Sequence, residues 1–332
     1  MSADVRYASV WNGQHWLPTD TTLPRRNTQR QITLMAYATD RWQRLTGRNR
    51  SFPATLLLVA IAACLLPFST GCSAPAETDT DTIQLVTTIL PLGDFARQVG
   101  GDRVDVTVMV PPGGSPHTHE PTPQQMIAVS EADIYVKTGS GIEFELVWMD
   151  KLIDQNRDMY IVDCSRGIAI QDGDPHIWNS PVNASDMVDT IRDGLTAIDP
   201  AGEDTYSRNC EDYKSQLAEL DGDIRTLFSE YTNRHFLMYH PSFGYFADEY
   251  ELTQLAVEHE GKSPTPQVLQ DVVDLAREHS LEYLFVGAQM SPFEAAGAAE
   301  AINAQTVTVD PLPEDYMSNM RQVADAIAME ME

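Results

Sequence analysis

From residue 83 onward, short β-branched segments alternate with segments of helical periodicity. The segments with strand character before residue 200 are 83–89, 104–110, 132–139 and 159–165. Helical spacing of apolar residues falls between them, in 91–99, 124–130 and 144–154. Four more strand-like segments follow, in 234–240, 253–259, 281–287 and 306–310. Strands that alternate with helices predict parallel sheets covered on both faces, the α/β class.

The longest helical stretch covers residues 201–231 and separates the two groups of strands. Its apolar positions recur every three or four residues, at Tyr206, Cys210, Tyr213, Leu217, Leu220, Ile224 and Leu227. A helix of this length would span roughly 45 Å. We therefore expect two similar α/β lobes, 83–200 and 232–332, joined by the one long helix 201–231.

The first 71 residues have a composition of their own, with eight Arg, no Lys and three acidic residues. An apolar run in 54–68 is shorter than the roughly 20 residues that span a membrane. It follows arginines and precedes small residues, which is the layout of a secretory signal. The small residues lead directly into Cys72, and Ser-Thr-Gly-Cys resembles the lipobox of bacterial lipoproteins.

This resemblance predicts a lipid at Cys72, which would become the new N-terminus. The signal peptide would then be 35–71, starting at Met35, and 72–82 would be a flexible tether, because it is small, polar and acidic. Residues 1–34 add nothing that a signal needs, so we expect an extension ahead of the true start or a disordered segment. The alternative for 54–68 is an ordinary N-terminal membrane anchor.

Acidic residues dominate the rest of the chain, with 46 Asp and Glu against 14 Lys and Arg in 72–332. Such a charge repels phosphate backbones, so nucleic-acid binding is not expected. It can gather cations by long-range attraction. An exported protein permits a disulfide between Cys164 and Cys210, but the sequence leaves this pairing open.

Four candidate metal ligands follow predicted strands. His117, His176 and His240 lie in the loops after 104–110 and 159–165 and at the end of 234–240, and Asp310 closes 306–310. Ligands of open α/β sheets gather outside the carboxyl ends of the strands, so two facing lobes would bring the four into one cleft. Three imidazoles and a carboxylate suit Zn²⁺ and tolerate Mn²⁺ or Fe²⁺.

Around these residues the chain resembles the zinc/manganese solute-binding proteins of ABC transporters. The motifs, in the family's order, are SPHTHEPTPQQ, DPHIWNSPVNA, YHPSFGYFADEY and VTVDPL. The resemblance covers about 84–330. It implies two α/β lobes, a rigid connecting helix and one metal in the cleft, held by His117, His176, His240 and Asp310.

The resemblance also implies an extracytoplasmic, lipid-anchored, monomeric protein that binds Zn²⁺ or Mn²⁺ as the transported ligand. Its partners would be an ABC permease and ATPase, and no enzymatic activity is expected. His119 would belong to the cleft wall or support a ligand, and Glu260 is an alternative carboxylate. A secreted metallohydrolase and a surface adhesin remain alternatives, although the chain has no HExxH motif to supply a catalytic base.

Overall fold

The structure is a computed structural model that describes residues 82–332 apart from 172, 259–263 and 332. The described residues form one compact unit. The predicted signal peptide, the lipidation site Cys72, nearly all of the tether and Glu260 lie outside the described residues. Among the described helices, none is both long enough and apolar enough to cross a membrane.

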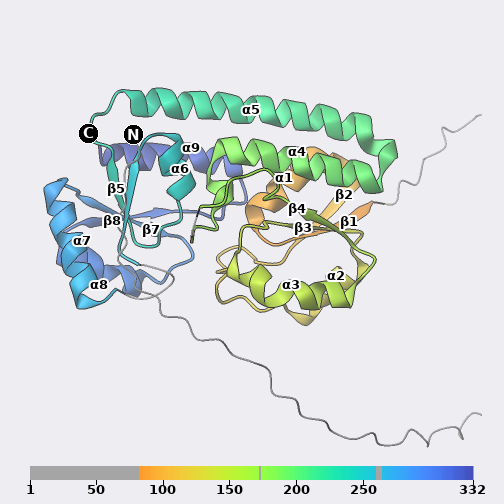
Figure 1. Ribbon diagram of the computed structural model, residues 1–332, viewed down its shortest axis with the longest axis horizontal. Coiled ribbons are helices and arrows are strands. Elements are labelled where there is room, and N and C mark those ends of the chain that lie inside the picture. Colours follow the sequence, from red (N-terminus) through yellow and green to blue (C-terminus); the bar gives the residue numbers. More distant parts are fainter. Residues whose placement is uncertain (1–81, 172, 259–263, 332) are drawn as a thin grey trace, which may run out of the picture. The chain divides into compact units, whose positions relative to one another are not determined.

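Each lobe is built on a four-stranded sheet in which all pairings are parallel (Figure 1). The first sheet has the order β2-β1-β3-β4, with the strands Ile83–Thr87 (β1), Val104–Val108 (β2), Ile134–Lys137 (β3) and Tyr160–Asp163 (β4). The second has the order β6-β5-β7-β8, with His235–Met238 (β5), Thr253–Ala256 (β6), Tyr283–Gly287 (β7) and Gln305–Val309 (β8). The two sheets therefore repeat one topology, and in each the chain reverses its direction of winding beside the first strand.

Helices cover both faces of the first sheet. Those of this lobe are Leu90–Gly100 (α1), Pro123–Glu131 (α2), Glu143–Gln155 (α3) and Pro181–Ile198 (α4). In Figure 1, α1 and α4 lie on the side of the sheet that faces the long helix Glu203–Ser229 (α5), whereas α2 and α3 lie on the other side. The short 3₁₀ segments are Gly101–Arg103 (η1), Ile177–Asn179 (η2) and Pro200–Gly202 (η3).

The long helix α5 packs against α1 and α4 of the first lobe and against Tyr316–Met329 (α9) of the second (Figure 1). Its buried stripe is Tyr206, Cys210, Tyr213, Leu217, Leu220, Ile224 and Phe228. Phe228 takes the place that the sequence assigned to Leu227, which is only partly buried. The helical period of 3.6 residues allows either neighbour to close such a stripe, and here the phenyl ring faces the core.

The second lobe adds Gly244–Glu249 (α6), Pro266–Glu278 (α7), Pro292–Ile302 (α8) and Tyr316–Met329 (α9). One large apolar cluster runs from the first lobe through α4 and α5 into α6 and α9. A smaller cluster lies between the second sheet and α7 and α8. The continuity of the large cluster joins the two lobes through a shared core.

The predicted fold class, two lobes with parallel sheets, is confirmed. Helix α4 was not predicted from the sequence, although Ser180 caps its N-terminus with its side chain and Pro181 occupies the first turn. Cys164 and Cys210 are both buried and free, so the structure contains no disulfide between them.

Candidate metal centre

Three loops bring the predicted histidines to one place. His117 lies between β2 and α2, His176 directly precedes the 3₁₀ segment η2, and His240 follows β5 by two residues. Each loop leaves the carboxyl end of a parallel strand, where the backbone turns away from the sheet and leaves room for side chains. The three rings therefore converge although 59 and 64 residues separate them in the sequence.

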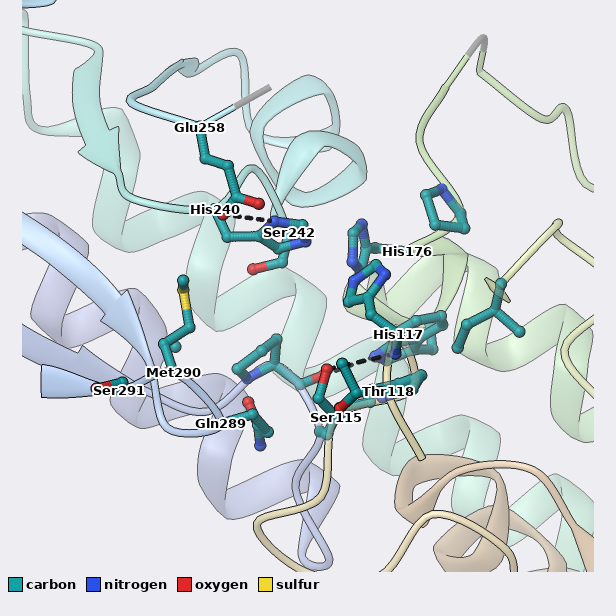
Figure 2. Close-up of a pocket in the computed structure, with 17 residues that line it drawn as sticks. Ser115, His117, Thr118, His176, His240, Ser242, Glu258, Gln289, Met290 and Ser291 are labelled. Atoms are coloured by element: carbon teal, nitrogen blue, oxygen red, sulfur yellow. Dashed lines mark hydrogen bonds and ion pairs between the residues drawn. The ribbon is translucent and has the colours of Figure 1, made fainter. Parts of the chain in front are cut away.

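The rings are close enough to share one ion. One ring nitrogen of each lies within 4.8 Å of one ring nitrogen of both others. The ring centroid of His240 is 5.3 Å from that of His117 and 5.2 Å from that of His176, with interplanar angles of 75° and 78°. Figure 2 shows the three rings gathered around one end of a cavity. Zn²⁺ accepts such a set, since its bonds to imidazole nitrogen measure about 2.0–2.1 Å.

Every one of these imidazoles has a carboxylate at its Nδ1 atom. The pairs are His176 with Asp174 at 2.7 Å, His117 with Glu143 at 3.3 Å, and His240 with Glu258 at 3.4 Å. An outer carboxylate fixes the tautomer of a ligating histidine and turns its other nitrogen toward the metal. The Nε2 atom of His240 is buried and has no hydrogen-bond partner among the described residues, as expected for a nitrogen that binds a metal ion.

His176 is the most buried of the three, with 8% of its surface exposed. Burial lowers the pKa of its imidazole, and the hydrogen bond to Asp174 opposes this shift only in part. The ring is therefore held neutral at physiological pH. A neutral imidazole is the form that binds a metal.

Asp310, the fourth predicted ligand, is not one of this close group. Its Oδ1 atom accepts hydrogen bonds from Nε2 of Gln289 at 2.6 Å and from the backbone N–H of Leu312 at 2.9 Å. Its two successors, Pro311 and Leu312, line the cavity, whereas Asp310 itself does not. The structure thus brings together three of the four predicted side chains and leaves the carboxylate beside them.

Sequence reasoning missed Glu258, the acidic residue that lines the cavity. It follows β6 by two residues, which is the same relation to a strand that singled out His240. The backbone N–H of Glu258 donates to the carbonyl of Tyr239 at 2.8 Å, and this bond holds the loop beside His240. The predicted alternative, Glu260, lies outside the described residues. His119 contacts Gln125 at 3.3 Å and does not line the cavity.

The segment that carries His176 is bonded to the second lobe. Nε1 of Trp178 donates to the carbonyl of Pro311 at 2.7 Å, and the hydroxyl of Tyr316 donates to the carbonyl of Trp178 at 2.7 Å. Nδ2 of Asn179 donates to the carbonyl of Ser242 at 2.8 Å. These bonds are buried, where an unpaired partner would be costly, so they hold the first-lobe and second-lobe histidines at a set distance.

The glycine of the YHPSFGYF motif, Gly244, allows a close contact between α6 and Asp174. A Cβ atom at this position would lie 2.3 Å from Oδ2 of Asp174, which is closer than any van der Waals contact. The absent side chain lets the start of α6 approach the carboxylate that orients His176. The hydroxyl of Tyr245 reinforces this contact by donating to the backbone carbonyl of Asp174 at 3.2 Å.

The cavity beside the histidines has a volume of about 400 Å³. Its lining comes from both lobes and includes Ser115, Ile142, Trp178, Ser242, Met290 and Leu312 in addition to the histidines and Glu258 (Figure 2). The loops that follow β7 and β8 close it on the side of the second lobe. The cavity therefore lies between the two sheets, outside the carboxyl ends of their strands.

Three imidazoles close enough to bind one ion, placed between two parallel-sheet lobes, define a metal-binding protein of the solute-binding class. Comparison with known proteins supports this assignment. The chain belongs to the ZnuA family, described as the zinc-uptake complex component A, periplasmic, and the match covers residues 85–330. The resemblance predicted from the four motifs is therefore confirmed.

Individual relatives are similar over most of their length. The high-affinity zinc uptake system protein ZnuA of Bacillus subtilis is 29% identical over 280 residues, which cover 77% of this chain and 88% of the relative. The manganese-binding lipoprotein MntA of Halalkalibacterium halodurans is 31% identical over 252 residues, which cover 71% and 80%. A crystal structure of ZnuA superimposes with a TM-score of 0.72 at 36% identity and covers 76% of this chain and 100% of that one.

Proposed function

We propose that this protein captures a divalent transition metal outside the cytoplasm, zinc in preference to manganese, and delivers it to an ABC permease and its ATPase. The observation that carries the proposal is the group of three imidazole nitrogens within 4.8 Å, each ring braced by its own carboxylate. Relatives that are named for zinc uptake and for manganese binding support a divalent transition metal as the ligand.

The donor set favours zinc. Three neutral imidazoles are donors of borderline softness, and Zn²⁺ lies above Mn²⁺ in the general order of affinity for such sites. Zn²⁺ also accepts four-coordination without penalty, whereas a site for Mn²⁺ is better served by several oxygen donors. Asp310 is proposed as a fourth ligand or as a support beside the site, because its neighbours Pro311 and Leu312 reach the cavity.

Competition titration of the metal-free protein tests the proposal. We expect one Zn²⁺ per chain, which an equal concentration of Mn²⁺ does not displace. His176→Ala and His240→Ala should each lose most of the zinc affinity, and Asp310→Asn should lose less. His279→Ala is the matched control, because this ring stacks on His235 at 3.7 Å and is absent from the cavity lining.

Displacement of zinc by manganese would show that the metal is wrong, and full affinity in His176→Ala would show that the site is wrong. Hydrolysis of an ester panel by the zinc-loaded protein would instead support the metallohydrolase alternative. Binding to host-matrix proteins in the absence of metal uptake would support the adhesin alternative. Zinc uptake into vesicles that contain the permease and ATPase should depend on added protein.

The proposed place of action rests on Cys72. Small residues precede this cysteine directly after the apolar run 54–68, so we expect cleavage before Cys72 and lipid on its thiol and amino group. Several acyl chains hold a protein stably at a membrane, whereas one does so only marginally. Mass spectrometry of the membrane fraction should find the modified Cys72. An unmodified Cys72 joined to its preceding residues would contradict the anchor.

A further inference from the structure

The loop between β3 and α3 contacts the segments of two of the three histidines. Glu143 begins α3 directly after this loop, and its Oε2 atom lies 3.3 Å from Nδ1 of His117. Within the loop, Oγ of Ser140 donates a hydrogen bond at 2.5 Å to the carbonyl of Pro175, the residue directly before His176. The conformation of the β3–α3 loop therefore bears on both histidines of the first lobe.

A single buried carboxylate fixes this loop. Glu145 lies in the first turn of α3 and is 7% exposed. Its Oε1 atom accepts hydrogen bonds from the hydroxyl of Thr88 at 2.6 Å and from the backbone N–H and the hydroxyl of Thr138 at 2.7 and 2.9 Å. Its Oε2 atom accepts from the backbone N–H of Gly139 at 2.9 Å. Because Thr88 follows β1 and Thr138 follows β3, the carboxylate joins the ends of two neighbouring strands to α3.

The four donors around Glu145 are all neutral hydroxyl or backbone groups. A buried charge raises the free energy of the folded state strongly unless hydrogen bonds offset the loss of water. A glutamine of the same size would place an NH₂ group where one carboxylate oxygen now accepts, and the donor facing it would lose its partner. The loop therefore requires acceptor atoms at both positions, and a carboxylate supplies them.

The backbone of the loop is also confined by close packing. Gly139 has a φ of +77°, and a Cβ atom there would overlap with Oδ1 of Asp163 at the end of β4. The loop thus lies against β4 on one side and is bonded to Glu145 on the other. Ile142 ends the loop as the N-cap residue of α3 and lines the cavity. A displaced loop would therefore change the cavity wall together with the two histidines.

We propose, on the basis of the metal-binding function proposed above, that Glu145 is a positioning residue for the metal. Its carboxylate fixes the β3–α3 loop, and through this loop it sets the rings of His117 and His176 at the distance that one ion requires. Glu145 does not line the cavity, so it acts through Glu143 and Ser140 and not on the ion. Metal affinity then depends on a side chain that does not touch the metal.

Zinc titration of Glu145→Gln against a chromophoric chelator tests this role. We expect about a tenfold loss of zinc affinity, the lower end of the range for residues that support metal ligands. Val99→Ala is the control, because Val99 is fully buried on α1 and absent from the cavity lining. It should lower the stability of the same lobe without lowering zinc affinity. Glu145→Gln would overturn the proposal if it lost stability in the same way and bound zinc as tightly as the wild type.

Thr138→Val is a milder variant that keeps the carboxylate, for the case that Glu145→Gln does not fold. It removes one hydroxyl donor, and we expect about a threefold loss of zinc affinity for the loss of one hydrogen bond. Thr190→Val is its control, since this hydroxyl donates to the backbone carbonyl of Asp186 within α4. Equal zinc affinities in the two threonine variants would contradict the proposal.

The route from Glu145 to the metal is tested in a protein that already carries Ser140→Ala and Glu143→Ala. In this background Glu145→Gln should lower zinc affinity little further, because substitutions that act through the same contacts are not additive. A further loss of about tenfold would show that Glu145 does not act through these two residues.

Amide hydrogen exchange of the metal-free protein gives a measurement that does not depend on zinc. The backbone N–H of Gly139 should exchange faster in Glu145→Gln than in the wild type, because its acceptor is lost. Unchanged exchange at Gly139 would overturn the hold of Glu145 on the loop. Failure of the wild-type protein to bind zinc would instead overturn the function on which the proposal rests.

Discussion

At the scale of single residues, the centre consists of ligands and of the groups that hold them. Asp174 shows this second kind of role, because its Oδ1 atom meets both the backbone N–H of His176 at 2.9 Å and Nδ1 of the same ring at 2.7 Å. One carboxylate oxygen therefore fixes the backbone and the side chain of a ligand together. Its removal would free the ring to rotate without removing any proposed metal ligand.

We predict that Asp174→Ala weakens zinc binding by about 10–100-fold, the usual cost of losing an outer partner of a metal ligand. His176→Ala should cost more, because it removes the donor nitrogen itself. Asp193→Ala is the control, since Asp193 is an exposed partner of Arg192 on α4. Titration against a chromophoric zinc chelator measures all three variants, and an unchanged affinity in Asp174→Ala would contradict the role of the carboxylate.

The pH dependence of zinc binding also tests the role of His176. Imidazoles must be neutral to bind zinc, and unperturbed imidazoles take up a proton near pH 6.5. Zinc affinity should therefore fall below about pH 6. Because burial lowers the pKa of His176, this ring should be protonated later than a free histidine as the pH falls.

The same shift affects the metal-free fold. Between the lowered pKa of folded His176 and its unfolded pKa near 6.5, the unfolded chain binds the proton that the folded chain excludes. Stability therefore decreases as the pH falls through this window. In His176→Gln this contribution should be absent, so denaturant midpoints measured from pH 7 to pH 5 should decline less steeply than those of the wild type. Equal slopes would contradict a lowered pKa at His176.

At the scale of elements, helix α4 packs closely against strand β4 of the first sheet. Gly194 is the point of closest approach, since a Cβ atom there would lie 2.4 Å from Cγ2 of Val162 on β4. Gly222 on α5 is the contrasting case, because it is exposed and a Cβ atom would meet nothing within 4 Å. Substitution at Gly222 therefore measures helix propensity alone, whereas substitution at Gly194 also measures packing.

We predict that Gly194→Ala destabilises the protein by about 1–3 kcal/mol, because the added methyl group overpacks the contact with β4. Gly222→Ala should stabilise it by roughly 0.5–1 kcal/mol, because alanine restricts the unfolded chain and favours a helix interior. Urea unfolding of both variants measures the difference. A stabilising Gly194→Ala would show that α4 can shift away from β4.

At the scale of the whole molecule, the excess of negative charge is the property that most affects stability. The sequence carries 49 acidic residues against 22 basic ones. Self-repulsion at such a charge destabilises a compact state, and dissolved salt screens it. The ion pairs of the described residues, such as Arg103 with Asp199 at 2.6 Å, offset only part of this excess.

We therefore predict that the melting temperature of the metal-free protein rises as NaCl increases from low to molar concentration. The same series with a non-ionic osmolyte separates screening from a general exclusion effect. A flat or falling melting temperature in NaCl would show that repulsion between acidic side chains is not what limits stability.

The sequence by itself was sufficient for the fold class and for the positions of the strands. Segments such as 83–89 and 104–110 contain the observed strands β1 and β2, because alternation and β-branching are local properties that precede any tertiary contact. The sequence also singled out His117, His176 and His240, because each lies after a predicted strand and within one of the recognised sequence motifs. Helix α4 was missed although its Ser-Pro start was available.

Only the tertiary structure decided which side chains meet. Glu258 and Asp310 both follow strands of the second sheet, and no local pattern separates them, yet one lines the cavity and the other bonds to Gln289 and Leu312. The pairing of each imidazole with a carboxylate, the free thiols of Cys164 and Cys210, and the unpartnered hydroxyl of Ser242 have the same origin. Such contacts join residues far apart in the chain, so their distances depend on how two lobes pack and cannot be read from spacing along one strand.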